Sequence, residues 1–470
     1  MKRRALFNLS LARKVVFCVS AMCLVQGIPA QEIDLYPPRA TPDRIMLNLT
    51  EQPATSAAFT WRTAVFVDSG VVQITEASPT PDLTVNARLV DASRTQFVSN
   101  LNAANYFSAV VDGLKPGTMY AYRVGYGMHV SEWAHFVTAD EEDETLSFIY
   151  FGDAQNDIKS LWSRAVRGAF QQMPKADFML HAGDLVNKPN NDHEWGEWFE
   201  AGGWIYQMIP SIATPGNHEY WEDDEDNAFL SLNWRPTFTL PENGPEGDEE
   251  ATYFIDYKNV RLISINSPGF LAYEEVAEAQ VSWLEEVLKS NTQKWTVLTM
   301  HHPIYSTAWG RDNDELRKAI QPLLEKYGVD LVLQGHDHSY GRGTNLPIGD
   351  SKNVTLGGPI YVVSVSGPKM YPVGLEEWMY RAGSNVQLYQ LINIDGDTLR
   401  YEAYTVDNVL YDAFELYRVE DGATQFSDLA PDIDEYLDLP PRFDKRMSDE
   451  EKAGYKTRFQ LYKERMGKEK

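Results

Sequence analysis

The stretch Val329-Asp330-Leu331-Val332-Leu333-Gln334-Gly335-His336-Asp337-His338 decides the fold. Its first half is apolar and β-branched, which predicts a buried strand, and its end carries two imidazoles. Four other segments also end in residues able to bind metal, and most of them follow apolar runs: Gly152-Asp153-Ala154-Gln155, Gly183-Asp184-Leu185, Gly216-Asn217-His218-Glu219 and Met300-His301-His302-Pro303. Open α/β sheets place ligands at the carboxyl ends of strands, so these side chains are expected to meet there. One Gly-Asp pair is common in turns, whereas five segments in this order indicate a single site.

The chain changes pattern at an acidic linker, residues 140–144. From Gln31 to the linker, short β-rich runs separated by turn signals predict an antiparallel β-sandwich with Trp61, Tyr120 and Tyr122 in its core. After the linker, strands and helices alternate as in an α/β domain. Strands are expected at residues 146–152, 178–183, 212–216, 253–265, 295–301, 329–335 and 360–365, and helices at 158–172, 274–289 and 315–327. Residues 448–470 are highly charged and are expected to form an exposed helix or a frayed tail.

The first thirty residues predict a secretory signal peptide. Five cationic residues precede an apolar run from Val15 to Leu24, which is too short to span a bilayer, and Ala30 marks the expected cleavage point. No other segment reaches the roughly 18 consecutive apolar residues of a membrane span. We therefore expect an exported protein, periplasmic or extracellular if the host is bacterial.

Composition limits the ligands and the partners. Both cysteines, Cys18 and Cys23, lie inside the predicted signal peptide, so no thiolate is left to bind metal. Histidine, carboxylate and amide ligands suit Zn, Fe or Mn. The formal net charge of −26 makes nucleic-acid binding through a basic surface unexpected. An anionic substrate would then need a local positive charge, which two bound cations would supply.

The five motifs together resemble those of the calcineurin-like metallophosphoesterases. The N-terminal segment with Pro53-Ala54-Thr55-Ser56 and Trp61 is similar to the N-terminal domain of the purple acid phosphatases, and residues 114–124 look like a hairpin of a fibronectin type III or immunoglobulin-like domain. The resemblance implies an N-terminal antiparallel β-sandwich followed by a four-layer α/β/β/α sandwich, the metallophosphoesterase fold. The predicted divisions are a signal peptide (1–30), the β-sandwich (31–142), the metallophosphoesterase domain (143–412) and a C-terminal extension with a charged helix (413–470).

The resemblance also implies a ligand set for two metal ions, with Asp184 bridging them. The first metal would take Asp153, Asp184 and His338, and the second Asp184, Asn217, His301 and His336. Gln155 stands where many relatives carry a histidine; it either ligates the first metal or orients a bound water, and a plain turn residue is the alternative. Asn187 stands where purple acid phosphatases carry the tyrosine that gives their colour, so we expect a protein that is not purple.

Other residues are candidates for acid–base and substrate roles. By the resemblance, His218 contacts the phosphate or protonates the leaving oxygen, a task that suits a histidine near its ordinary pKa. Glu219 is expected to orient that imidazole. Asn187 and Asn313 are candidate substrate contacts, although Asn313 in the segment Arg311-Asp312-Asn313 is equally well placed to cap a helix. His302 is expected to hold a ligand in place or to pack, and His181 to hold a ligand in place; neither is expected to bind metal.

The function implied is that of an acid-phosphatase-like hydrolase that acts on small phosphorylated substrates. A metal-bound hydroxide would attack phosphorus in line. A phosphodiesterase or nucleotidase on the same site is one alternative, because fold and ligands do not fix the substrate. A non-catalytic surface-binding module with a degenerate phosphatase domain is another. Neither the oligomeric state nor the identity of the metals follows from the sequence.

Overall fold

The structure is a computed structural model that describes residues 34–345, 354–419 and 423–467. The predicted signal peptide of residues 1–30, with both cysteines, lies outside the described residues, as do the last three residues of the charged tail. Within the described ranges, no helix combines the length and the apolar character needed to cross a membrane.

The N-terminal part is the predicted antiparallel β-sandwich. One layer contains β1 (Asp43–Asn48), β2 (Ala57–Ala64), β6 (Ala103–Val111) and β5 (Ser93–Val98); the other contains β4 (Arg88–Asp91), β3 (Val71–Glu76), β7 (Met119–Tyr126), β8 (His129–Val130) and β9 (Ala134–Val137). Trp61, Tyr120 and Tyr122 lie in the core between the layers, as predicted, together with Phe59 and Phe136. Inward-facing aromatic residues on alternate strand positions therefore hold the two layers together.

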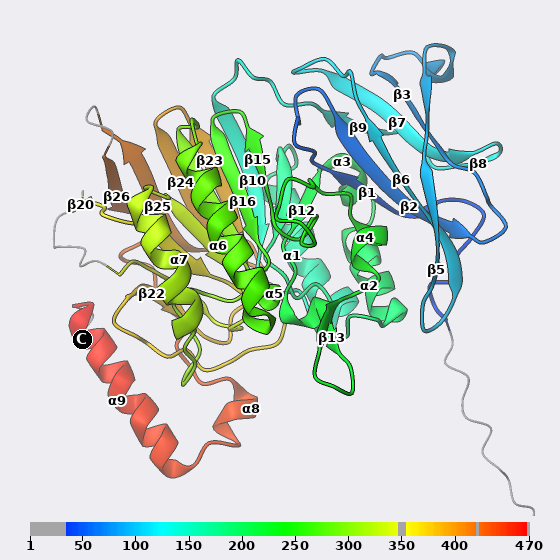
Figure 1. Ribbon diagram of the computed structural model, residues 1–470. Helices are drawn as coiled ribbons and strands as arrows, with labels where there is room; N and C mark the ends of the chain where they lie inside the picture. The colour runs from blue at the N-terminus through cyan, green and yellow to red at the C-terminus, as the bar shows by residue number, and fades with distance from the viewer. Residues whose placement is uncertain (1–33, 346–353, 420–422, 468–470) are drawn as a thin grey trace, which may run out of the picture. The chain divides into compact units, whose positions relative to one another are not determined.

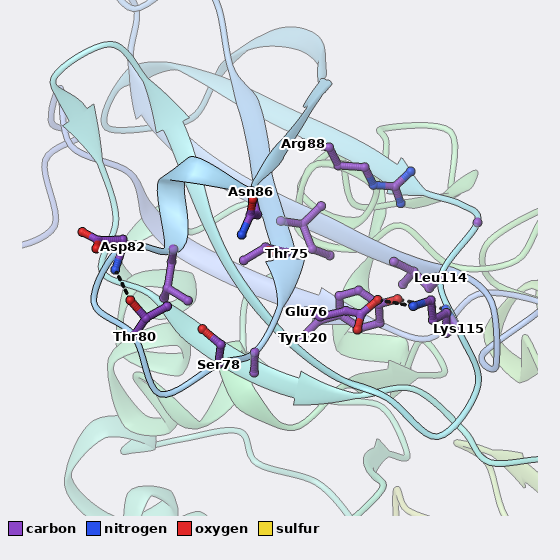
Figure 2. A pocket seen from close by; sticks show the side chains of 14 residues that line it. Thr75, Glu76, Ser78, Thr80, Asp82, Asn86, Arg88, Leu114, Lys115 and Tyr120 are labelled. Atoms are coloured by element: carbon purple, nitrogen blue, oxygen red, sulfur yellow. Dashed lines mark hydrogen bonds and ion pairs between the residues drawn. The ribbon is translucent and has the colours of Figure 1, made fainter.

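The prediction of a hairpin at residues 114–124 is wrong. β6 pairs with β2 and β5, whereas β7 pairs with β3, β8 and β9, so the chain crosses from one layer to the other between Val111 and Met119. A pocket opens on this domain, near the crossover, with Glu76 and Lys115 paired at its edge (Figure 2).

Two sheets build the second part of the chain. The larger continues the sandwich layer, in the order β20-β26-β25-β24-β23-β10-β11-β12-β1-β2-β6-β5, and the smaller has the order β15-β16-β17-β18-β21-β19-β22. The strands of the larger sheet not yet given are β10 (Thr145–Phe151), β11 (Phe178–His181), β12 (Ser211–Ala213), β20 (Val354–Thr355), β23 (Leu388–Asp395), β24 (Thr398–Thr405), β25 (Leu410–Arg418) and β26 (Thr424–Asp428). Those of the smaller are β15 (Tyr253–Tyr257), β16 (Val260–Ile265), β17 (Trp295–Met300), β18 (Leu331–Gln334), β19 (Tyr340–Gly343), β21 (Ile360–Val363) and β22 (Met379–Gly383).

Side chains alternate between two apolar layers along the smaller sheet. On β18, Leu331 and Leu333 face the core shared with the larger sheet, while Val332 faces the opposite layer. That opposite layer is covered by α6 (Glu274–Lys289) and α7 (Asp314–Lys326) (Figure 1). The larger sheet is covered by α1 (Ser163–Gln172), which follows a π-helical segment at Ile158–Trp162, and by α2 (Asp192–Gly202) and α3 (Ile205–Met208). The predicted four-layer α/β/β/α architecture is confirmed.

Element boundaries differ from expectation in a few places. The single strand expected at residues 253–265 is a hairpin, because Lys258 adopts a left-handed φ of 53° and turns the chain between β15 and β16. The charged C-terminal helix forms as α9 (Asp449–Arg465), capped by Ser448 and Glu451, but Tyr455 and Tyr462 on it are buried. β25 runs across residue 412, so the sheet continues past the predicted end of the metallophosphoesterase domain; the domain boundaries stay predictions.

The β-sandwich and the α/β part of the chain share a sheet and a buried charge cluster. β1 pairs in parallel with β12, and the Asn48 side chain donates to the Ser211 carbonyl at 2.9 Å. Beside this junction, Arg44 of β1 pairs with Asp192 at the start of α2, 2.6 Å between Nη1 and Oδ1, with both side chains almost fully buried. Arg62 of β2 lies 3.4 Å from the other Asp192 oxygen. The Asp192 carboxylate thus lies between two buried guanidinium groups, and Arg62 has a second carboxylate partner in Asp43.

Candidate metal centre

The five motifs follow the carboxyl ends of five strands, three in the larger sheet and two in the smaller. Asp153, Asp184 and Asn217 follow β10, β11 and β12, while His301 follows β17. His336 and His338 follow β18 in the smaller sheet. The structure brings all these side chains into one cluster.

Glycines make the close approach possible. A Cβ atom at Gly216 would lie 2.2 Å from Asp184 Oδ1, and one at Gly335 would lie 2.4 Å from Asp153 Oδ1, so any other residue would collide with a candidate ligand. Asp184, His336 and His338 adopt left-handed φ values of 52°, 75° and 47°. Non-glycine residues in this region are strained, and such strain is concentrated at functional sites.

The first group of candidate ligands contains Asp153, Asp184 and His338, all buried, with one ligand atom from each within 4.8 Å of the others. His338 Nε2 lies 3.3 Å from Asp153 Oδ2. Gln155 is beside them: its Nε2 contacts Asp184 Oδ2 and lies 3.2 Å from His338 Nε2, while its Oε1 faces Lys369 Nζ at 3.3 Å. In this orientation Gln155 donates to a ligand carboxylate and offers no oxygen to a cation.

The second group contains Asp184, His301 and His336, joined by Asn217. Asn217 Oδ1 lies 3.1 Å from His301 Nε2 and 2.9 Å from His336 Nδ1, and His301 Nε2 lies 3.2 Å from Asp184 Oδ1. The other nitrogen of His301, Nδ1, donates to the Ala182 carbonyl at 2.8 Å. This bond fixes the ring so that its Nε2 faces the cluster, as is usual for metal-binding histidines.

The donor set fits two cations. Asp153 Oδ2 is buried and accepts no hydrogen bond within the described chain, a costly state that a bound cation would relieve. Burial, and then the nearby Asp184 carboxylate, raise the pKa of Asp153 to about 7, although His301 opposes the shift. Burial lowers the pKa of His301, but Asp184 and Asp153 outweigh it and raise that pKa to about 9.

His218 lies at the edge of the cluster with its side chain 27% exposed. Its Nδ1 is 2.7 Å from the Asn187 carbonyl oxygen, and its backbone N–H donates to Asp184 Oδ1 at 2.9 Å. The free Nε2 lies 4.0 Å from Asp184 Oδ2. His218 also lines a cavity of about 440 Å³ together with Asn217 and His302. The backbone carbonyl of Asn187 thus orients His218, and the predicted contact of the Asn187 side chain with substrate stays a prediction.

Glu219 does not orient His218, and this prediction needs correction. The Glu219 carboxylate accepts four backbone N–H groups instead: Oε2 accepts from Asp184 and Gly216 at 2.8 Å, and Oε1 from Leu185 at 2.8 Å and Val186 at 3.3 Å. It therefore joins the two turns that carry Asp184 and Asn217. The local sequence gives no sign of these bonds, because all four partners are backbone groups.

Asn313 is not directed at the cluster either. Its side chain donates to the Pro303 carbonyl at 2.7 Å, so it anchors the loop after the fourth motif to the start of α7. Its neighbour Arg311 is closer to the metal ligands: Nη1 lies 3.2 Å from Asp337 Oδ1 and 3.4 Å from the His336 carbonyl. His302 packs against His336, with 4.2 Å between ring centroids, and hydrogen-bonds with Ser267.

Sequence reasoning missed Lys369 and Tyr371. Besides the contact of Lys369 with Gln155, the Tyr371 ring lies 4.8 Å from that of His338, and its N–H donates to the His338 carbonyl at 2.9 Å. Both residues lie in the loop after β21, residues 364–378, which carries none of the Asp, Asn or His residues that mark the five motifs. The one available signal was a lysine near an aromatic residue in a strongly acidic chain.

His181 is not in contact with the ligands, contrary to expectation. Its ring packs among Phe151, Trp162 and Trp198, and neither ring nitrogen has a hydrogen-bond partner in the described chain. Burial lowers its pKa to about 3. Below about pH 6.5 the unfolded chain therefore binds a proton on His181, whereas the folded chain does not. The free energy of unfolding consequently decreases as the pH falls from 6.5 towards 3.

We expect His181→Phe to raise the free energy of unfolding at pH 7 by about 1–2 kcal/mol, because two unpaired nitrogens leave the core. The gain should grow by about 2 kcal/mol between pH 7 and pH 5, at 1.4 kcal/mol per unit below 6.5. Urea unfolding at both pH values measures this, with the exposed His129→Phe as control. An identical pH dependence in His181→Phe and the parent protein would contradict it.

Comparison with known proteins agrees with this geometry. The calcineurin-like phosphoesterase family matches residues 147–340, and the purple acid phosphatase N-terminal domain matches residues 42–138. Purple acid phosphatase 15 of Arabidopsis thaliana is 25% identical over 312 residues, which cover 58% of this chain and 56% of that one. Purple acid phosphatase 1 of Ipomoea batatas is 28% identical over 257 residues, covering 52% and 53%. The chain thus spans little more than half the length of the curated relatives it matches.

Among solved structures, a purple acid phosphatase from yellow lupin (Lupinus luteus) seeds has the same fold. It superposes with a TM-score of 0.68 at 19% identity, covering 82% of this chain and 75% of that one. The sequence families, the two-part fold and the position of the motifs therefore agree. The chain thus carries a calcineurin-like phosphoesterase domain at residues 147–340, preceded at residues 42–138 by the N-terminal domain of the purple acid phosphatases.

Proposed function

We propose that this protein is an exported phosphoesterase that hydrolyses phosphomonoesters with two metal ions, Fe, Zn or Mn. One observation carries the proposal: Asp184 belongs to both groups of candidate ligands, so its carboxylate would be shared by the two cations. The carboxylates, imidazoles and amide around it match the ligand preferences of these metals. The relatives named as purple acid phosphatases support the same activity. Export rests on the signal-peptide pattern of residues 1–30.

The chain's own residues set up the reaction as follows. Two cations held by the two groups would acidify water and polarise the phosphoryl oxygens. Glu219 holds the turns that carry Asp184 and Asn217 in fixed register, so the ligands are preorganised. His218 directs its Nε2 towards the open side of the cluster, because its Nδ1 is held by the Asn187 carbonyl. A proton on Nε2 is placed for transfer to the leaving oxygen as its bond to phosphorus breaks.

The test is hydrolysis by protein reconstituted with each metal. We expect release of phosphate from p-nitrophenyl phosphate and alkyl phosphates, with about two metal ions bound per chain. Faster hydrolysis of bis(p-nitrophenyl) phosphate than of the monoester would instead establish a diesterase. No turnover over a panel of monoesters, diesters and nucleotides, together with less than one bound metal ion, would favour the binding-module alternative.

His218→Ala distinguishes proton donation from phosphate binding. If Nε2 protonates the leaving oxygen, kcat for an alkyl phosphate should fall roughly 10²–10⁴-fold, whereas p-nitrophenyl phosphate, whose leaving group needs no proton, should lose far less. Steady-state kinetics on both substrates and metal analysis of the variant measure this, with His193→Ala as a control for a half-exposed histidine away from the ligands. Equal losses on the two substrates would assign His218 to phosphate binding.

A further inference from the structure

A second cavity, of about 330 Å³, adjoins the metal centre and is lined with positive charge. Its wall contains three cationic side chains and three aromatic rings, and no carboxylate: Arg311, Lys369, Arg442, Trp309, Tyr371 and Phe443. The chain as a whole has 68 acidic and 42 basic residues, so a pocket without any acid is unlike the rest of this molecule. Such a pocket concentrates anions from a solution that the remaining surface repels.

The cavity shares its wall with the candidate ligands. Lys369 Nζ lies 3.3 Å from the Gln155 side chain, and the Tyr371 ring packs on His338 at 4.8 Å. The guanidinium of Arg311 lies over the same Tyr371 ring, 4.9 Å from its centroid, while Asp337 holds its Nη1 at 3.2 Å. A group bound in this cavity would therefore lie next to a phosphoryl group held at the metal centre.

The C-terminal extension completes the cavity. Arg442 and Phe443 belong to the short helix α8 (Pro441–Asp444), and the Phe443 ring contacts Tyr371 at 5.6 Å between centroids. The next helix, α9, is fastened to the catalytic part by the buried Tyr455 and Tyr462. Tyr455 donates to the Leu437 carbonyl at 3.1 Å and packs against Trp309. Arg442 is thus held over the cavity by a docked segment.

Two of the three cations form no ion pair with a carboxylate of the described residues, although the charge of Lys369 also acts on the buried Asp153 carboxylate. Arg311 is partly neutralised by Asp337. Within the described residues, neither Lys369 nor Arg442 forms an ion pair with a carboxylate, and the one polar contact recorded for Lys369 is to the neutral Gln155 amide. Unpaired cations around a concave site are suited to an external anion.

We propose that this cavity is a specificity subsite that binds a second phosphoryl group, carried on the leaving group of the substrate, and that Lys369 and Arg442 contact it. The inference rests on the proposed function, because it places the reacting phosphoryl group at the metal centre. During hydrolysis a water oxygen forms a bond to the reacting phosphorus, and the bond to the leaving oxygen breaks. The leaving oxygen keeps the electron pair and takes up a proton, while the second phosphoryl group stays unchanged on the departing product.

The experiment compares inorganic pyrophosphate, which carries the second phosphoryl group, with p-nitrophenyl phosphate, which does not. The quantity measured is kcat/KM for pyrophosphate divided by kcat/KM for p-nitrophenyl phosphate. This ratio does not change when a variant loses activity equally on both substrates. We expect Arg442→Gln and Lys369→Gln each to lower this ratio about tenfold or more, as for loss of a hydrogen bond between charged groups. The matched control is Arg446→Gln, an exposed arginine four residues after Arg442 that does not line the cavity, which should leave the ratio within twofold.

Binding of pyrophosphate to the metal-loaded protein, measured by calorimetry, separates this inference from the proposed function. If neither substrate were hydrolysed, the proposed function would be overturned. Even then, a tenfold weaker Kd for pyrophosphate in Arg442→Gln, with an unchanged Kd for inorganic phosphate, would support the subsite. Equal losses for both substrates in Arg442→Gln and Lys369→Gln would overturn the subsite. So would an unchanged ratio together with an unchanged pyrophosphate Kd.

Discussion

Asp184→Asn is expected to lower kcat/KM for a phosphomonoester by about 10³-fold or more, because loss of roughly 4 kcal/mol of stabilisation of the transition state corresponds to a factor of that size. Asp184 is the one residue common to both candidate ligand groups. The amide keeps the size of the side chain and its contact with the His218 N–H, but it removes the negative charge and one of the two oxygens that would bridge two cations. Rate and bound metal should therefore fall together.

The measurement is steady-state hydrolysis of p-nitrophenyl phosphate by reconstituted protein, with elemental analysis of the same sample. Asp112→Asn, an exposed carboxylate in the β-sandwich, is the matched control and should retain the activity and metal content of the parent protein. Full activity in Asp184→Asn with two metal ions still bound would remove the basis for a bridged centre.

Asp192→Ala is expected to lower the free energy of unfolding by about 3–5 kcal/mol, the usual cost of breaking a buried ion pair from one side. The carboxylate lies 2.6 Å from Arg44 and 3.4 Å from Arg62, and all three side chains are almost fully buried. Arg62 keeps a second partner in Asp43, at 2.8 Å, but the guanidinium of Arg44 would be left with only Tyr106 and a backbone carbonyl. The strands of the sandwich would then lose their charged contact with α2.

Urea unfolding of the variant and the parent protein measures this loss. Glu197→Ala on the same helix is the control, because this half-exposed carboxylate has a weak pairing with His193 at 3.9 Å and should cost at most about 1 kcal/mol. A loss below about 1 kcal/mol in Asp192→Ala would show that the buried pair contributes little, for example because water enters the junction.

Much of the fold followed from local patterns. The catalytic strands were visible because they are continuous apolar runs buried on both sides, and α6 and α7 because their apolar residues recur on one face. β5 was not found, since it lies at an edge and exposes nearly every side chain. The crossover after β6 was misread as a hairpin, because the same turn residues serve a tight turn and a passage between layers.

The candidate ligands were identifiable because metal binding demands particular side chains at strand ends. The residues that hold them were not. The Glu219 carboxylate accepts hydrogen bonds from backbone N–H groups of two turns, and the backbone carbonyl of Asn187 holds the His218 ring. Because each contact uses a backbone group, no particular residue type marks it in the sequence. Lys369 and Arg442 lie in one cavity because the C-terminal extension packs against the loop after β21, and this long-range contact cannot be predicted from a local sequence pattern.

The parallel pairing of β1 with β12 gives the N-terminal domain a protective role. Without the sandwich, β12 would become the last strand of its sheet and would present unpaired backbone N–H and C=O groups. Such a border recruits strands from other molecules and leads to aggregation. The N-terminal domain thus protects the edge of the larger sheet from pairing with other copies of the chain. Removing this domain would expose that edge.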